Sequence, residues 1–144
     1  MAVDHRAHTT WEGDLASGSG VFTLGSGVTG PQTVTWRARA EDASAGTSPE
    51  ELIAAALASC FSMALSGSLA RAGTPPQKLE TDVVSTFEGG VGITKLAVTV
   101  RGEVEGIDEN AFREAAEGAK ENCPVSKALK GNVEITLDAA LAGG

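Results

Sequence analysis

The stretch SPEELIAAALASCFSMALSGSLA, residues 48–70, decides the fold of this chain. It has the start of a helix: Ser48 suits the N-cap, Pro49 suits the first helical position, and Glu51 completes a capping box. Beyond Glu51 the stretch carries no charge, and its apolar residues fall on every side of the predicted helix. Gly73 is the expected stop. Because a helix that is apolar all round must be surrounded, the stretch predicts a long, buried central helix.

Strand patterns lie on both sides of this helix. The segments 8–14, 19–28 and 32–40 alternate or carry turn residues, which is typical of an antiparallel meander. The segments 78–88 and 92–106 are strand-like runs joined by the turn GGVG, which predicts a hairpin.

The remaining segments predict two more helices and a final strand. Residues 107–122 are amphipathic and capped by Asp108, residues 123–130 restart a short helix, and residues 132–141 resemble a strand. The order βββ–α–ββ–αα–β predicts an α+β fold in a single domain over residues 1–144. Thin sheets of one chain cover only part of an apolar helix. We therefore predict an intertwined homodimer, in which antiparallel sheets pack around the central helices.

Composition and charge argue against several function classes. The chain has 144 residues, 11 basic and 19 acidic, for a formal net charge of −8, and no basic stripe. Nucleic acid and anionic membrane surfaces are therefore not expected partners. The first fourteen residues lack the apolar core of a signal peptide, so we expect a cytoplasmic protein with reduced thiols. Serines and a glycine interrupt the apolar stretch, which favours a core helix over a membrane span.

The chain has two cysteines, Cys60 in the apolar helix and Cys123 just before Pro124. Taken alone, Cys60 is either an inert small hydrophobic residue or a reactive thiol. Cys123 occupies a predicted N-cap, where free backbone N–H groups can donate to its sulfur. We expect no metal site, because His5 and His8 show none of the usual ligand spacings.

A reactive Cys60 would need a positive partner. Burial among apolar side chains raises the pKa of a thiol, and arginine is the cation that stays charged when desolvated. Two unit charges ~4 Å apart at an effective dielectric of ~20 attract by about 4 kcal/mol, enough to offset a typical burial penalty. Arg37 and Arg39 project from one face of the predicted strand 32–40, and Glu50 could orient a guanidinium. The alternatives are solvent-facing arginines and an ordinary charged first helical turn.

Both cysteine segments resemble one family. TSPEELIAAALASCFSMAL (residues 47–65) is similar to the signature of the OsmC/Ohr family, the osmotically inducible and organic-hydroperoxide-resistance proteins. ENCPVSKAL (residues 121–129) is similar to the family's second cysteine segment. Residues 8–20 and 92–108 are similar to its OsmC branch, so the resemblance covers nearly the whole chain.

The resemblance implies an OsmC-like thiol peroxidase that reduces organic hydroperoxides, and hydrogen peroxide less well, to alcohols. Cys60 matches the peroxidatic cysteine and Cys123 the resolving one, which implies a Cys60 sulfenic acid followed by a Cys60–Cys123 disulfide. Glu50 matches the family's carboxylate and Arg39 the arginine of OsmC-like members, with Arg37 as the fallback. The resemblance further implies a homodimer with sites built from both chains and a dithiol reductant, with dihydrolipoyl groups as the candidate. It implies no cofactor: no metal, haem or flavin.

Two other functions stay open from the sequence. One is a non-catalytic redox sensor that signals through the same disulfide, and the other is a stress-induced dimeric binding protein with inert thiols. If the chain is a peroxidase, a dry pocket would favour organic hydroperoxides. The candidates for its lining are Leu57, Phe61, Met63 and Leu65.

Overall fold

The computed structural model describes residues 1–142, and its contacts divide the chain into two compact units. The first unit is Met1–Leu52, and the second begins at Ile53. The boundary falls within helix α2 (Pro49–Arg71). The single domain expected over residues 1–144 stays a prediction, since units defined by contacts can still fold together.

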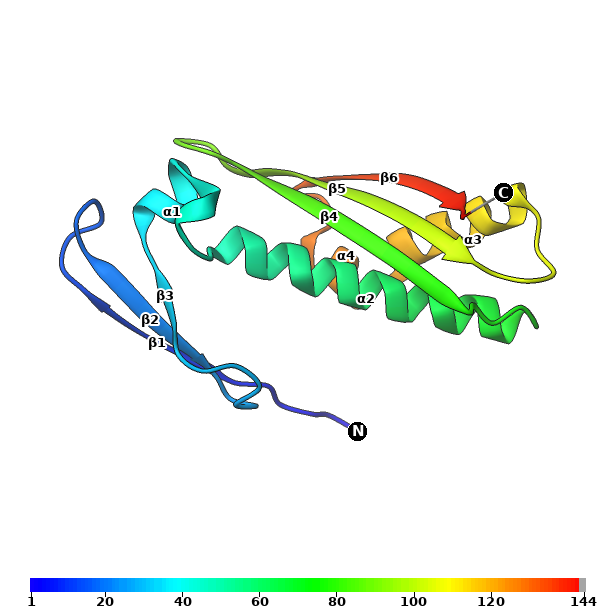
Figure 1. Ribbon diagram of the computed structural model, residues 1–144, viewed down its shortest axis with the longest axis horizontal. Helices are drawn as coiled ribbons and strands as arrows, with labels where there is room; N and C mark the ends of the chain where they lie inside the picture. Colours follow the sequence, from blue (N-terminus) through cyan, green and yellow to red (C-terminus); the bar gives the residue numbers. More distant parts are fainter. Residues whose placement is uncertain (143–144) are drawn as a thin grey trace. The chain divides into compact units, whose positions relative to one another are not determined.

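The first unit contains a three-stranded antiparallel sheet in the order β1-β2-β3 (Figure 1). β1 (Ala7–Glu12) pairs with β2 (Ser19–Leu24), and β2 pairs with β3 (Gln32–Val34). The predicted meander is confirmed, although its strands are shorter than the sequence pattern indicates.

The predicted strand 32–40 is wrong beyond Val34, because a short helix, α1 (Trp36–Ala40), takes its place. Thr35 has extended backbone, and its hydroxyl accepts a hydrogen bond from the Ala38 N–H at 3.2 Å. A threonine N-cap followed by alanine and arginine favours a helix despite the alternating pattern. A 3-10 turn, η1 (Ala43–Ala45), follows. The arginines at 37 and 39 therefore project from a helix, not from a strand.

Helix α2 is the long helix that the opening stretch predicts. The Ser48 hydroxyl accepts a hydrogen bond from the Glu51 N–H at 3.1 Å, which confirms the N-cap. At the other end Gly73 takes a φ of +90°, a conformation that glycine adopts without strain, and the helix stops before it.

In the single chain α2 is buried on one face only. Its buried apolar residues follow each other at intervals of four: Leu57, Phe61, Leu65 and Leu69. Met63 is 74% exposed, and Ala56 and Ala70, one heptad away on either side, are exposed as well. Within the described residues, α2 is a helix long and apolar enough to cross a bilayer, and the core helix of a non-membrane protein meets the same criteria.

The second unit contains a sheet in the order β4-β5-β6. β4 (Lys78–Glu88) and β5 (Gly92–Glu103) form the predicted hairpin, whereas β6 (Glu134–Leu141) pairs with β5 in parallel. This parallel pair departs from the expected antiparallel sheets. The helices between β5 and β6 carry the chain back to the starting end of β5, so β6 enters in the same direction.

Two helices follow β5, α3 (Glu109–Asn122) and α4 (Pro124–Leu129), as predicted. Asp108 caps α3 by accepting a hydrogen bond from the Ala111 N–H at 2.8 Å. α2 and α3 cover one face of the sheet (Figure 1). The core of the unit lies between these helices and β5. Its fully buried members from β5 and α3 are Leu96, Val98, Val100, Phe112 and Ala116.

Candidate active site

The fold brings the two cysteines together in the second unit. The Cys60 thiol, from the middle of α2, lies beside the Cys123 thiol, which sits between α3 and α4. Both thiols are free. Cys123 is 1% exposed and Cys60 is partly buried against the same core cluster. Two sulfurs far apart in the sequence are thus placed where a disulfide between them is chemically reasonable.

Backbone amides at the start of α4 hold both sulfurs. Cys123 is the N-cap of α4, as predicted, and its Sγ accepts a hydrogen bond from the Ser126 N–H at 3.4 Å. The Val125 N–H lies near the Cys60 sulfur and lowers the pKa of this thiol. The Ser126 hydroxyl, which the sequence analysis did not single out, lies 3.0 Å from the Cys123 Sγ.

Burial raises the pKa of the Cys60 thiol. The Val125 N–H acts in the opposite direction, and the neighbouring Cys123 thiol raises the pKa further. No cation among the described residues contributes to this shift. In the single chain Cys60 is therefore a neutral thiol at neutral pH, as expected from its apolar surroundings, and its activation requires a positive charge from elsewhere.

The first unit contains a fixed guanidinium. The Arg39 Nε donates to both carboxylate oxygens of Glu50, at 2.5 and 3.2 Å. Glu50 is 5% exposed and the Arg39 side chain 35%, so a buried carboxylate holds a partly exposed guanidinium in one orientation. Arg37 is exposed and pairs with Asp42 at 3.4 Å instead. Of the two arginines left open by the sequence, Arg39 is the one held by Glu50.

A predominantly apolar hollow of about 250 Å³ adjoins this ion pair within the first unit. This hollow was not predicted from the sequence, because strands, a loop and two helix starts each contribute to it. One signal was available: both tryptophans of the chain line the hollow. Its lining residues are Trp11, Leu15, Val34, Thr35, Trp36, Arg39 and Pro49.

The dry pocket expected from α2 is not observed. Leu57, Phe61 and Leu65 have no exposed surface and fill the core of the second unit, while Met63 lies on the surface. The reason is the four-residue spacing, which places three of these side chains on the face that packs against β5. Across residues 1–142, no group of three or more His, Cys, Asp or Glu side chains is arranged to hold a metal ion.

A profile of OsmC-like proteins matches residues 41–138. The chain belongs to the OsmC family. Peroxiredoxin OsmC of Escherichia coli (strain K12) is 43% identical to this OsmC-family chain over 141 residues, which cover 96% of each protein. The organic hydroperoxide resistance protein OhrA of Bacillus subtilis (strain 168) is 36% identical over 107 residues, which cover 71% of this chain and 73% of OhrA.

Solved structures confirm the OsmC-like α+β fold. The crystal structure of an OsmC-like protein from Mycoplasma pneumoniae matches with a TM-score of 0.72 at 16% identity, over 98% of this chain and 99% of its own. OhrB of Bacillus subtilis matches with a TM-score of 0.65 at 28% identity, over 93% and 97% of the two chains. The two cysteine segments that resemble the family in sequence therefore occur in a chain that also has the family's fold.

Proposed function

We propose that this OsmC-family chain is a cysteine-based peroxidase that reduces organic hydroperoxides, and hydrogen peroxide less well, to alcohols. The observation that carries the proposal is the placement of two free thiols, Cys60 and Cys123, beside each other at one core cluster. The names of its relatives, a peroxiredoxin and an organic hydroperoxide resistance protein, point to the same chemistry. The compartment that we propose is the cytoplasm, where such thiols stay reduced.

The proposed first step takes place at Cys60. Its thiolate attacks the distal oxygen of ROOH, and the O–O bond breaks with its electron pair on the leaving alkoxide. The alkoxide takes a proton and departs as the alcohol, while Cys60 becomes a sulfenic acid. The Cys123 thiol then attacks this sulfur, which forms the disulfide and releases water. Exchange with an external dithiol, such as a dihydrolipoyl group, restores both thiols.

The first step needs a cation, because burial raises the pKa of Cys60. We propose that Arg39, held by Glu50, stabilises the thiolate and donates to the charge developing on the leaving oxygen. We further propose a homodimer in which each site combines the thiols of one subunit with the arginine of the other. The family resemblance implies this arrangement, and a second subunit would also cover the exposed face of α2.

The substrate preference that we propose rests on the hollow beside Arg39. Its lining is largely apolar and includes Trp11 and Trp36. The organic part of a hydroperoxide would leave water there, with a gain of about 0.8 kcal/mol for each buried CH₂ group. Hydrogen peroxide has no apolar part and cannot gain from such a surface.

The decisive experiment compares single-cysteine variants in a coupled assay with cumene hydroperoxide and a dithiol. Cys60→Ser is expected to abolish peroxide consumption. Mixed with the peroxide in the absence of the dithiol, Cys123→Ser is expected to consume one equivalent and to accumulate a sulfenic acid that dimedone traps. Wild-type turnover in Cys60→Ser would refute the proposal.

A redox sensor is the second candidate, since the same pair of thiols could form a signalling disulfide. A sensor would react once with peroxide and would not turn over with a dithiol. A binding protein with inert thiols would show no fast reaction of Cys60 with cumene hydroperoxide at all. The same assay therefore separates the three functions.

A further inference from the structure

We infer that Ser126 is a positioning residue for the second step of the proposed peroxidase cycle and relays the proton of Cys123 to solvent. Ser126 is 3% exposed, and its Oγ lies 3.0 Å from the Cys123 Sγ. Its own N–H donates to the same sulfur at 3.4 Å, which fixes the sulfur against the hydroxyl. This inference rests on the proposed function.

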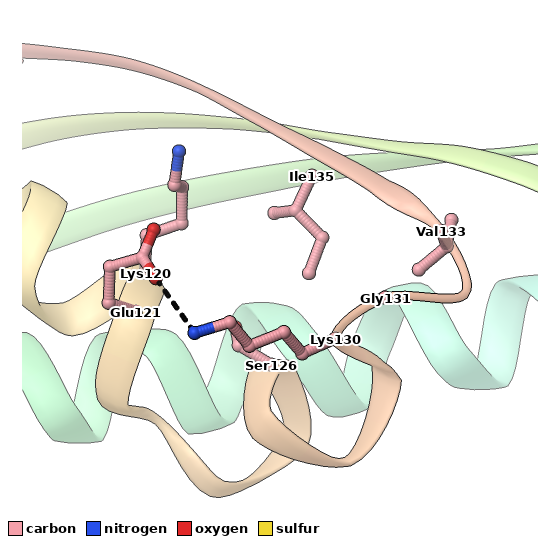
Figure 2. Close-up of a pocket in the computed structure, with 7 residues that line it drawn as sticks. All are labelled: Lys120, Glu121, Ser126, Lys130, Gly131, Val133 and Ile135. Carbon is pink, nitrogen blue, oxygen red and sulfur yellow. Dashed lines mark ion pairs between the residues drawn. The ribbon is translucent and has the colours of Figure 1, made fainter.

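Ser126 connects a buried thiol with a hollow in the surface. Cys123 is 1% exposed, so its sulfur has almost no direct contact with water. Ser126 lines a hollow of about 160 Å³, whose opening carries the ion pair of Lys130 with Glu121 at 3.6 Å (Figure 2). Both of these charged side chains are exposed, so the hollow is open to solvent. The remaining lining residues are Lys120, Gly131, Val133 and Ile135.

The second step requires such a connection. When Cys123 attacks the Cys60 sulfenic acid, an S–S bond forms and two bonds break, the S–O bond of Cys60 and the S–H bond of Cys123. The oxygen leaves with the S–O electron pair and ends as water, so one proton must leave the Cys123 sulfur. Cys123 is oxidised and the sulfenic sulfur is reduced, which needs no further reagent.

The Ser126 hydroxyl is suited to this transfer. A backbone N–H can only donate, whereas a hydroxyl can accept the thiol proton through a lone pair and pass its own proton to water in the hollow. The other neighbour of the Cys123 sulfur is Cys60, which is the electrophile in this step. The same route run backwards would return the proton when the dithiol reduces the disulfide.

The test separates the two steps by rapid mixing of the reduced protein with cumene hydroperoxide. In Ser126→Ala, sulfenic acid formation at Cys60 is expected at the wild-type rate, and disulfide formation is expected to slow about tenfold. Ser126→Thr keeps a hydroxyl and is expected to restore the second step. The matched control is Ser85→Ala, since the buried Ser85 Oγ has no hydrogen-bond partner among the described residues.

A second readout needs no substitution. Disulfide formation in the wild type is expected to slow in D₂O, and Ser126→Ala is expected to lose that sensitivity. Three results would each overturn the inference without contradicting the proposed peroxidase function. They are a wild type whose disulfide formation is insensitive to D₂O, an unchanged rate of disulfide formation in Ser126→Ala, and a Ser126→Thr variant that does not restore this rate. If the wild type forms no sulfenic acid at all, the proposed function itself fails.

Discussion

Two arginines two positions apart in α1 show how much a single residue's partner matters. Arg39 is held by the buried carboxylate of Glu50, whereas Arg37 lies on the surface beside Asp42. An exposed ion pair contributes little because both charges are solvated and screened. A guanidinium fixed by a buried carboxylate keeps its orientation and can act on a third group. Arg37 and Arg39 therefore allow a direct comparison of the same side chain beside an exposed and beside a buried carboxylate.

Arg39→Ala is expected to shift the pH profile of Cys60 alkylation to higher pH. In the proposed site the loss of this positive charge removes what opposes the effect of burial, so the thiol pKa is expected to rise. The measurement is the rate of iodoacetamide alkylation against pH in a Cys123→Ser background, with Arg37→Ala as the matched control. An unchanged profile in Arg39→Ala, or an equal shift in both variants, would assign the cation elsewhere.

At the scale of elements, the contact between α3 and β5 shapes the core of the second unit. Gly102 lies on β5 opposite the fully buried ring of Phe112. A Cβ at position 102 would lie 2.6 Å from two ring atoms, which is closer than real atoms approach. The helix packs so tightly on the strand because this position has no side chain.

Gly102→Ala is expected to lower the free energy of unfolding by about 1–3 kcal/mol, because the ring or the strand must shift. Gly118→Ala is the control: Gly118 lies in α3, and a Cβ there would have no atom within 4 Å. That substitution is expected to raise the stability by about 0.5–1 kcal/mol, since alanine is the better helix former. Denaturant midpoints measure both, and a neutral Gly102→Ala would show that the contact is loose.

At the scale of the whole molecule, the halves of the proposed site belong to different units. The thiols lie in the second unit and the Arg39–Glu50 pair in the first. The exposed apolar face of α2, with Met63 at its centre, also calls for a covering surface. A symmetric dimer that shares its sites would meet both requirements.

Complementation tests this arrangement. A heterodimer of one Cys60→Ser subunit and one Arg39→Ala subunit, isolated with two affinity tags, has one complete site if the two chains share their sites. It is expected to show about half of the wild-type activity, although each parent homodimer is inactive. If every site lies within one chain, the heterodimer is inactive too. A monomer in light scattering would also contradict the proposal.

Much of the fold was predictable because its signals are local. Ser48 and Asp108 cap their helices through hydrogen bonds that span three residues, and alternation along β4 and β5 sets their inner faces. The resemblance named Cys60, Cys123, Arg39 and Glu50 before any coordinates, and their catalytic roles stay predictions. The strand predicted over residues 36–40 is a helix, since an alternating pattern five residues long fits a short helix as well as a strand.

The sequence by itself determined most of the helices and strands, and it showed which family the chain resembles. Only the tertiary structure decided that Cys60 and Cys123 lie side by side, that Arg39 rather than Arg37 binds Glu50, and that Ser126 stands between a thiol and a hollow. The physical reason is the distance along the sequence over which the interactions act. Caps and alternation depend on neighbours within a few residues, whereas these contacts depend on how whole elements pack.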